Sequence, residues 1–230
     1  MGEYQVDILD FEDSFTWNIA CELEMIGLTS QIIPFSSVQN HLIKCKNNTS
    51  VKKILLFGPG PGHPDEYIFL QNHIAELLGF NNYFFMGICL GHQLLWKTLG
   101  VGTIQSDYPM HGQSVDVTLP NWNYFSKYLR GKKVAVQKYN SLKLDHKSLH
   151  EQLDEHVFFQ EESLIGQFKR GITYQFHPES VGTTYRSEFF LGLKNFLYNE
   201  SDENSNPHRR HLRSKTYSIP QTDVGESIFL

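Results

Sequence analysis

Gly87-Ile88-Cys89-Leu90-Gly91-His92-Gln93 is the stretch that decides the fold, because it places a cysteine between two glycines at G-x-C-x-G spacing. An apolar run, Tyr83–Met86, precedes it, and leucines at helical spacing follow it at Leu94, Leu95 and Leu99. This order predicts a strand, a sharp turn and a helix, which is the setting of a nucleophile elbow.

Cys89 has two interpretations on this pattern alone. Flanking glycines let the backbone turn tightly, and the start of a helix favours a thiolate through its free N–H groups and its dipole. A buried structural cysteine is the alternative, since free cysteines are among the most buried residue types. The choice between nucleophile and core residue depends on the rest of the chain.

The first half of the chain alternates strand and helix patterns. Strands are expected at Val6–Leu9, Gln31–Pro34, Ile54–Phe57 and Tyr83–Ile88, with helices at Ser14–Ile26 and Leu70–Leu78. Strands that are apolar throughout and separated by helices predict an α/β fold, in which helices cover both faces of a central, mostly parallel sheet.

The second half is richer in short strand patterns. We expect antiparallel additions to the sheet at Val115–Leu119, Val134–Tyr139, Val157–Gln160 and Ile172–Phe176, followed by a closing helix over Phe189–Leu197. The sequence therefore predicts one domain over residues 1–198. The polar segment 199–230 is expected to be a flexible tail.

Composition narrows the function classes. The 230 residues carry a net charge of -5, which argues against a general nucleic-acid-binding protein. No apolar run is long enough to span a membrane, so no membrane partner is expected. Cys21, Cys45 and Cys89 are odd in number and form no C-x-x-C pair, which favours a reducing, cytoplasmic location.

A cysteine nucleophile needs a base, and the base needs a group that orients it. His177 and Glu179 lie two residues apart in Gln175-Phe176-His177-Pro178-Glu179-Ser180, so in an extended segment both side chains point to the same side. Glu179 can then hold the imidazole in the tautomer that accepts a proton from Cys89. An exposed histidine and glutamate at a strand end are the alternative.

Gly58-Pro59-Gly60-Pro61-Gly62 follows the expected strand Ile54–Phe57 directly. It lacks both the Lys-Ser/Thr of a P-loop and the spacing of a dinucleotide fingerprint. An ordinary Gly/Pro turn is one interpretation. The other is a rigid loop at the carboxyl edge of the sheet, whose N–H groups join the Leu90 amide in an oxyanion hole.

In this order, the three motifs resemble those of the class I (triad) glutamine amidotransferases, which have a flavodoxin-like three-layer fold. The stretch Asp10–Asn18 resembles the branch that serves anthranilate and aminodeoxychorismate synthases. The resemblance covers about residues 4–198. Two positions depart from the family pattern: Phe11 stands where asparagine is common, and Asn140 where histidine is usual.

The resemblance implies a role for eight residues. Cys89 would be the nucleophile, His177 the base and Glu179 its orienting group, while the remaining residues would bind the oxyanion (Gly60, Leu90) or the α-amino and α-carboxylate groups of glutamine (Gln93, Ser141, Leu142). The implied reaction hydrolyses L-glutamine to glutamate and ammonia through a cysteinyl thioester.

A chorismate-binding synthase subunit on another chain would receive the ammonia, with anthranilate the favoured product. The alternatives are aminodeoxychorismate synthase, a free-standing γ-glutamyl hydrolase and a non-catalytic binding subunit. No metal-ligand motif is present, so no cofactor is expected in this chain. The resemblance places magnesium on the synthase partner.

Overall fold

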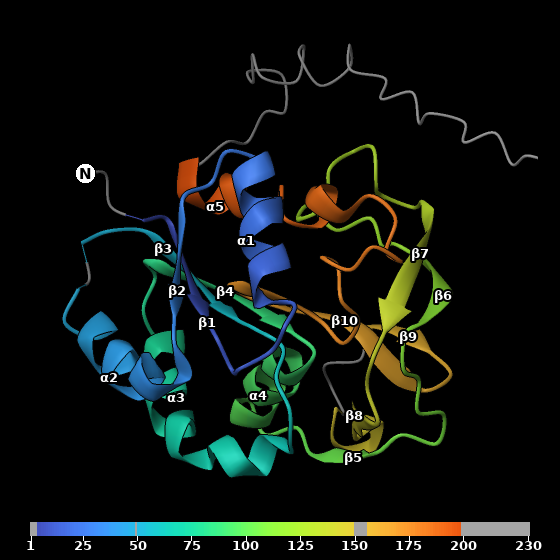
Figure 1. Cartoon of the computed structure of the whole chain (residues 1–230), viewed down its shortest axis with the longest axis horizontal. Coiled ribbons are helices and arrows are strands. Elements are labelled where there is room, and N and C mark those ends of the chain that lie inside the picture. Colours follow the sequence, from blue (N-terminus) through green and yellow to red (C-terminus); the bar gives the residue numbers. More distant parts are fainter. Residues whose placement is uncertain (1–3, 49, 150–155, 199–230) are drawn as a thin grey trace, which may run out of the picture. The chain divides into compact units, whose positions relative to one another are not determined.

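A seven-stranded sheet forms the centre of the described chain, in the order β2-β1-β3-β4-β11-β10-β9 (Figure 1). The computed structural model describes residues 4–48, 50–149 and 156–198, so the expected tail 199–230 lies outside the described residues. The strands are β1 (Val6–Leu9), β2 (Ser30–Ile33), β3 (Lys53–Phe57), β4 (Tyr83–Ile88), β9 (His156–Phe159), β10 (Glu162–Phe168) and β11 (Gly171–Tyr174). β2, β1, β3, β4 and β11 pair in parallel, whereas β10 is antiparallel to β11 and β9. The expected α/β class is confirmed.

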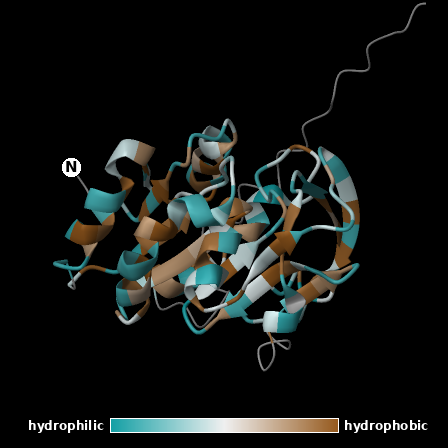
Figure 2. Ribbon diagram, turned by 90° about the horizontal axis from the view of Figure 1, so that it is seen from below, coloured by the Kyte–Doolittle hydropathy of each residue, from teal (hydrophilic) through white to brown (hydrophobic). Residues whose placement is uncertain are grey.

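Helices cover both faces of this sheet. They are α1 (Thr16–Met25), α2 (Phe35–Cys45), α3 (Gln71–Leu78), α4 (Leu90–Thr98) and α5 (Leu193–Tyr198), with short 3₁₀ turns at Pro64–Leu70, His146–Ser148 and Arg186–Phe189. Val6 and Ile8 of β1 pack in one core with α1, while Leu9 packs with α2, α3 and α4 in the other. Figure 2 shows hydrophobic residues along the central strands. In the described part of the chain, no helix is long and apolar enough to cross a membrane.

Helix α2 was not expected from the sequence. Most of its residues, FSSVQNHLIKC, are polar or small, and only Val38, Leu42 and Cys45 are buried. These three lie four and three positions apart, which puts them on one helical face. One narrow apolar stripe is enough to dock the helix on the sheet, but it is a weak signal in a sequence.

Three expectations for the second half were wrong in detail. β6 (Gln113–Thr118) and β7 (Lys133–Lys138) form a separate antiparallel sheet instead of joining the central one. β11 is parallel to β4, and all four of its residues are buried, as is usual for a strand covered on both faces. The closing helix starts only at Leu193, because Phe189 ends a 3₁₀ turn. β5 (Thr103–Gln105) and β8 (Leu142–Leu144) make a further small sheet.

The glycines of the G-x-C-x-G stretch are required by close backbone packing. A Cβ atom at Gly91 would lie 2.0 Å from the carbonyl oxygen of Phe57, and one at Gly87 would lie 2.6 Å from that of Gly91. The Gly91 amide donates to the Gly58 carbonyl at 3.2 Å. The first turn of α4 therefore lies directly against the end of β3 and the loop that follows it.

Gly91→Ala should lower the free energy of unfolding by at least the roughly 1–3 kcal/mol typical of overpacking, since the obstructing atom is a backbone oxygen. Gly102→Ala is the matched control, because a Cβ there would have its nearest neighbours at 3.7 Å. We expect the control to change stability by less than about 1 kcal/mol. Urea unfolding followed by circular dichroism measures both, and equal stabilities would contradict the packing argument.

Candidate active site

Cys89 occupies the sharp turn between β4 and α4. Its backbone has φ 52° and ψ -103°, a conformation that residues with a Cβ rarely adopt. The turn is held by two hydrogen bonds, from the Cys89 amide to the Tyr174 carbonyl at 2.8 Å and from the Gln93 amide to the Cys89 carbonyl at 3.2 Å. The side chain is partly exposed. This is the geometry of a nucleophile elbow.

His177 and Glu179 follow β11 and pair with each other. His177 Nδ1 lies 2.7 Å from Glu179 Oε1, and both side chains are buried. The second carboxylate oxygen of Glu179 has no hydrogen-bond partner among the described residues. The carboxylate therefore fixes the imidazole through Nδ1, which leaves Nε2 for the reacting groups.

The charge of His177 is set by opposing effects. Burial lowers the pKa of the imidazole, but the negative charge of Glu179 and hydrogen bonds with Cys89 and Glu179 outweigh it, so the pKa is held well above its usual value. The charged form of the imidazole is therefore favoured more strongly than in a free histidine. An imidazolium beside a cysteine allows one pair of residues to supply both the nucleophile and a proton donor.

The surroundings of His177 restrict its position. Its amide donates to the Gln137 carbonyl of β7 at 2.9 Å, and its carbonyl accepts from Thr183 Oγ1 at 2.7 Å. The rings of Phe15 and Tyr139 each lie 5.0 Å from the imidazole. Phe15 belongs to the Asp10–Asn18 stretch, which carries the resemblance to the chorismate branch. Its contact with His177 joins segments that are distant in the sequence and was not predicted.

The glycine-proline loop lies against the start of α4. A Cβ atom at Gly60 would be 2.7 Å from Leu90 Cδ2 and 2.5 Å from Phe11 Cβ, so only glycine fits there. The two residues expected to supply oxyanion N–H groups are therefore neighbours. Phe11 is buried and packs edge-on against Tyr67 at 5.2 Å. In place of the usual asparagine, it gives the loop an apolar support.

Gln93 and Leu142 also come together, and Ser141 directly precedes Leu142 in the chain. Gln93 Nε2 donates to the Leu142 carbonyl at 3.2 Å and to Gln175 Oε1 at 3.0 Å. Gln175 Nε2 lies 3.8 Å from the sulfur of Cys89. The buried Gln175, which was not among the expected site residues, thus links Gln93 to the thiol. Its place in the Gln175–Ser180 string was the only signal in the sequence.

Asn140 holds the Ser141–Leu142 segment in place through a hydrogen-bond network. Its Nδ2 donates to the Leu142 carbonyl at 2.9 Å and to Glu162 Oε1. Glu162 in turn pairs with Lys138 Nζ at 2.6 Å, and both side chains of that pair are buried. Breaking a buried pair leaves an uncompensated charge, so this network constrains the Ser141–Leu142 segment strongly.

Comparison with known proteins assigns the family. A model described as glutamine amidotransferase class-I matches residues 7–198. The chain belongs to this family. Its resemblance to the family is thereby confirmed, and it is an enzyme of the glutamine-hydrolysing type.

Individual relatives add detail about this amidotransferase. Anthranilate synthase component 2 of Helicobacter pylori is 29% identical over 181 residues, covering 78% of this chain and 90% of that protein. The carbamoyl phosphate synthase small chain of Helicobacter acinonychis is 31% identical over 209 residues, covering 83% of this chain but 49% of that protein. The solved structure of a glutamine amidotransferase from Thermotoga maritima has a TM-score of 0.53 at 19% identity, covering 77% of this chain and 77% of that one.

Glu179→Gln should lower kcat for glutamine hydrolysis by about 10²–10⁴-fold, the range found when acid–base groups or their orienting carboxylate are lost. Removing the Glu179 charge removes one of the two groups that raise the pKa of His177, while burial still lowers it, so this pKa falls. If the imidazolium is the proton donor, activity is lost as pH rises through this pKa, so the alkaline limb of the kcat profile should move to lower pH. Glu24→Gln, at an exposed position of α1, is the control. An unchanged alkaline limb in Glu179→Gln would contradict this assignment.

Proposed function

We propose that this amidotransferase is the glutaminase subunit of a chorismate-using synthase, with anthranilate as the favoured product. The observation that carries the proposal is the match to an anthranilate synthase component 2 along 90% of that protein's length. The carbamoyl phosphate synthase small chain is slightly more similar in percentage identity, but this chain spans only about half of it. The Asp10–Asn18 stretch, which contacts the imidazole of His177 through Phe15, also favours the chorismate branch.

The first chemical step is attack of the Cys89 thiolate on the side-chain amide carbon of glutamine. The amide oxygen becomes an oxyanion, and the N–H groups of Gly60 and Leu90 stabilise it. Each such donor typically lowers the barrier by about 3 kcal/mol. The close approach of Gly60 to Leu90, the residue that directly follows Cys89, supports this pairing. Gln93, Ser141 and Leu142 hold the α-amino and α-carboxylate groups.

The second step releases ammonia and regenerates the enzyme. The His177 imidazolium donates its proton to the leaving nitrogen, the carbon–nitrogen bond breaks, and a glutamyl thioester remains on Cys89. The neutral imidazole then takes a proton from water, whose oxygen attacks the thioester and yields glutamate. Glu179 keeps the imidazole in one tautomer through both steps.

The ammonia can react with its acceptor only if it arrives unprotonated, because ammonium is not a nucleophile. The proposal therefore includes a partner synthase subunit that encloses the path of ammonia and binds chorismate with magnesium. An aminodeoxychorismate synthase would use the same glutaminase steps. A free-standing γ-glutamyl hydrolase would need no partner, and it would show full activity alone.

Cys89→Ser should reduce glutaminase activity by at least about 10³-fold, since the thioester can no longer form. Cys21→Ser, on the exposed side of α1, is the matched control and should retain activity. Mass spectrometry of the intact protein with glutamine should show a glutamyl adduct in the control only. Retained activity in Cys89→Ser would overturn the proposed mechanism.

The partner can be identified by affinity capture with the full chain, followed by an assay with glutamine and chorismate. We expect glutamine-dependent formation of anthranilate by the recovered complex. Formation of aminodeoxychorismate would support the alternative synthase. Recovery of no chorismate-using enzyme, together with strong glutaminase activity of the chain alone, would contradict the subunit proposal.

A further inference from the structure

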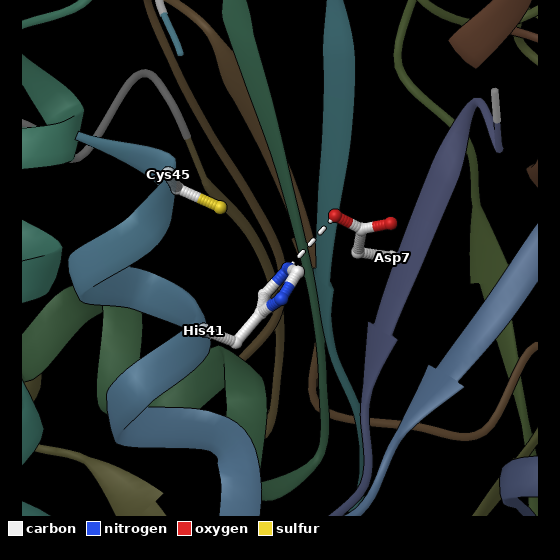
Figure 3. A group of neighbouring side chains, drawn as sticks. All are labelled: Asp7, His41 and Cys45. Atoms are coloured by element: carbon white, nitrogen blue, oxygen red, sulfur yellow. Dashed lines mark hydrogen bonds and ion pairs between the residues drawn. The ribbon is translucent and has the colours of Figure 1, made fainter. Parts of the chain in front are cut away.

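Asp7, His41 and Cys45 form a second group of carboxylate, histidine and cysteine side chains (Figure 3). Asp7 is on β1, and His41 and Cys45 are on α2. Asp7 is near the amino end of its strand, whereas Cys89 follows the carboxyl end of β4. Because β1, β3 and β4 are parallel, the two groups lie at opposite ends of these strands: Asp7 at the amino end and Cys89 at the carboxyl end.

The three side chains converge on one small volume. His41 and Cys45 are four residues apart on the helix, so they share a face, and that face is turned toward Asp7 (Figure 3). His41 Nε2 lies 2.8 Å from Asp7 Oδ2. One donor atom from each residue lies within 4.8 Å of the other two. Asp7 is 0% exposed and Cys45 6% exposed.

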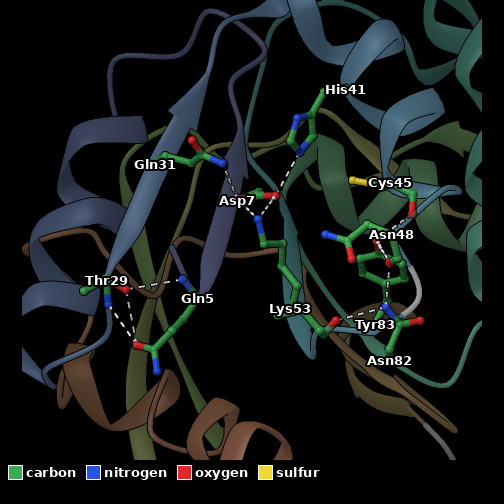
Figure 4. Close-up of polar contacts among 11 residues, drawn as sticks. Gln5, Asp7, Thr29, Gln31, His41, Cys45, Asn48, Lys53, Asn82 and Tyr83 are labelled. Carbon is green, nitrogen blue, oxygen red and sulfur yellow. Dashed lines mark hydrogen bonds and ion pairs between the residues drawn. The ribbon is translucent and has the colours of Figure 1, made fainter. Parts of the chain in front are cut away.

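Further groups hold the carboxylate in place (Figure 4). Gln31 Nε2 donates to Asp7 Oδ1 at 2.7 Å, and Lys53 Nζ lies 3.2 Å from Oδ1 and 3.1 Å from Oδ2. On the other side, the Tyr83 hydroxyl donates to the Cys45 carbonyl at 2.7 Å. These contacts account for the charge of Asp7. They do not explain why the thiol of Cys45 lies beside this histidine and carboxylate. The proposed glutamine hydrolysis uses none of these three side chains.

We propose that Asp7, His41 and Cys45 bind a divalent transition-metal ion, with Zn²⁺ the best fit. Thiolate, imidazole and carboxylate are the ligands that zinc takes in proteins, whereas magnesium and calcium prefer oxygen alone. Three protein ligands leave a fourth position for water.

The geometry needs only small movements to accept the ion. Zinc lies roughly 2.0–2.2 Å from nitrogen or oxygen and about 2.3 Å from sulfur, so its ligand atoms are roughly 3.3–3.8 Å apart. The His41–Asp7 contact has to lengthen from 2.8 Å, and the other separations, at most 4.8 Å, have to shorten by up to about 1.0–1.5 Å to reach these ligand spacings. Binding displaces the proton between His41 and Asp7 and the proton of the thiol. Gln31 can keep Oδ1 while the ion takes Oδ2, and Lys53 Nζ, which lies 3.1 Å from Oδ2, then has to move to Oδ1 alone.

Cobalt titration tests the proposal directly, because a cobalt–thiolate bond gives a charge-transfer absorption band. The full chain is used with Cys89→Ser, so that the active-site thiol cannot contribute. We expect a band that saturates at one Co²⁺ per chain and is displaced by Zn²⁺. Adding Cys45→Ser should abolish the band, whereas adding Cys21→Ser, at an exposed cysteine, should leave it unchanged.

A second measurement separates metal binding from folding. Zn²⁺ should raise the melting temperature of the Cys89→Ser protein, and His41→Gln should remove that rise while leaving the far-ultraviolet circular dichroism unchanged. Absence of the cobalt band, or a band that survives Cys45→Ser, would overturn the proposal. The group would then be an ion network around Asp7 and nothing more. Failure of the glutaminase proposal would leave these measurements unaffected.

Discussion

The contact between the first turn of α4 and the end of β3 governs the geometry of the active site. The helix can approach that closely only because Gly91 presents no side chain to the carbonyl of Phe57. With both ends of the turn fixed, Cys89 is left in a backbone conformation with positive φ. The same contact brings Gly60 next to Leu90. The strained turn at Cys89 and the contact between Gly60 and Leu90 therefore both depend on this close packing.

The sequence predicted what depends on local patterns. The elbow at Cys89 and the parallel strands β1, β3 and β4 follow from glycine spacing and continuous apolar runs, and the structure agrees. Contacts between distant segments were not predictable in this way. Gln175 reaches Gln93 and the thiol across strands, and Phe15 reaches His177 from a different part of the chain. Helix α2 was not predicted, because only a narrow stripe of its residues is apolar.

A buried carboxylate contacts an imidazole close to a sulfur atom at both ends of the parallel strands, the amino end and the carboxyl end. Glu179 contacts His177, and Asp7 contacts His41. The two groups differ in access: Cys89 is partly exposed, whereas Cys45 is buried. A substrate the size of glutamine needs an open approach to the thiol. A single ion does not, so the difference in exposure agrees with the different ligands inferred for the two groups.

The β6–β7 sheet holds the imidazole through the backbone. The amide of His177 donates to the carbonyl of Gln137 on β7, and this pairing is the bridge between the small sheet and the segment after β11. A buried amide of this kind exchanges its hydrogen with solvent only when the bond opens. The hydrogen-exchange rate of the His177 amide therefore reports how readily the β6–β7 sheet separates from the segment that carries the imidazole. It can be measured with the protein alone, in the absence of substrate and partner.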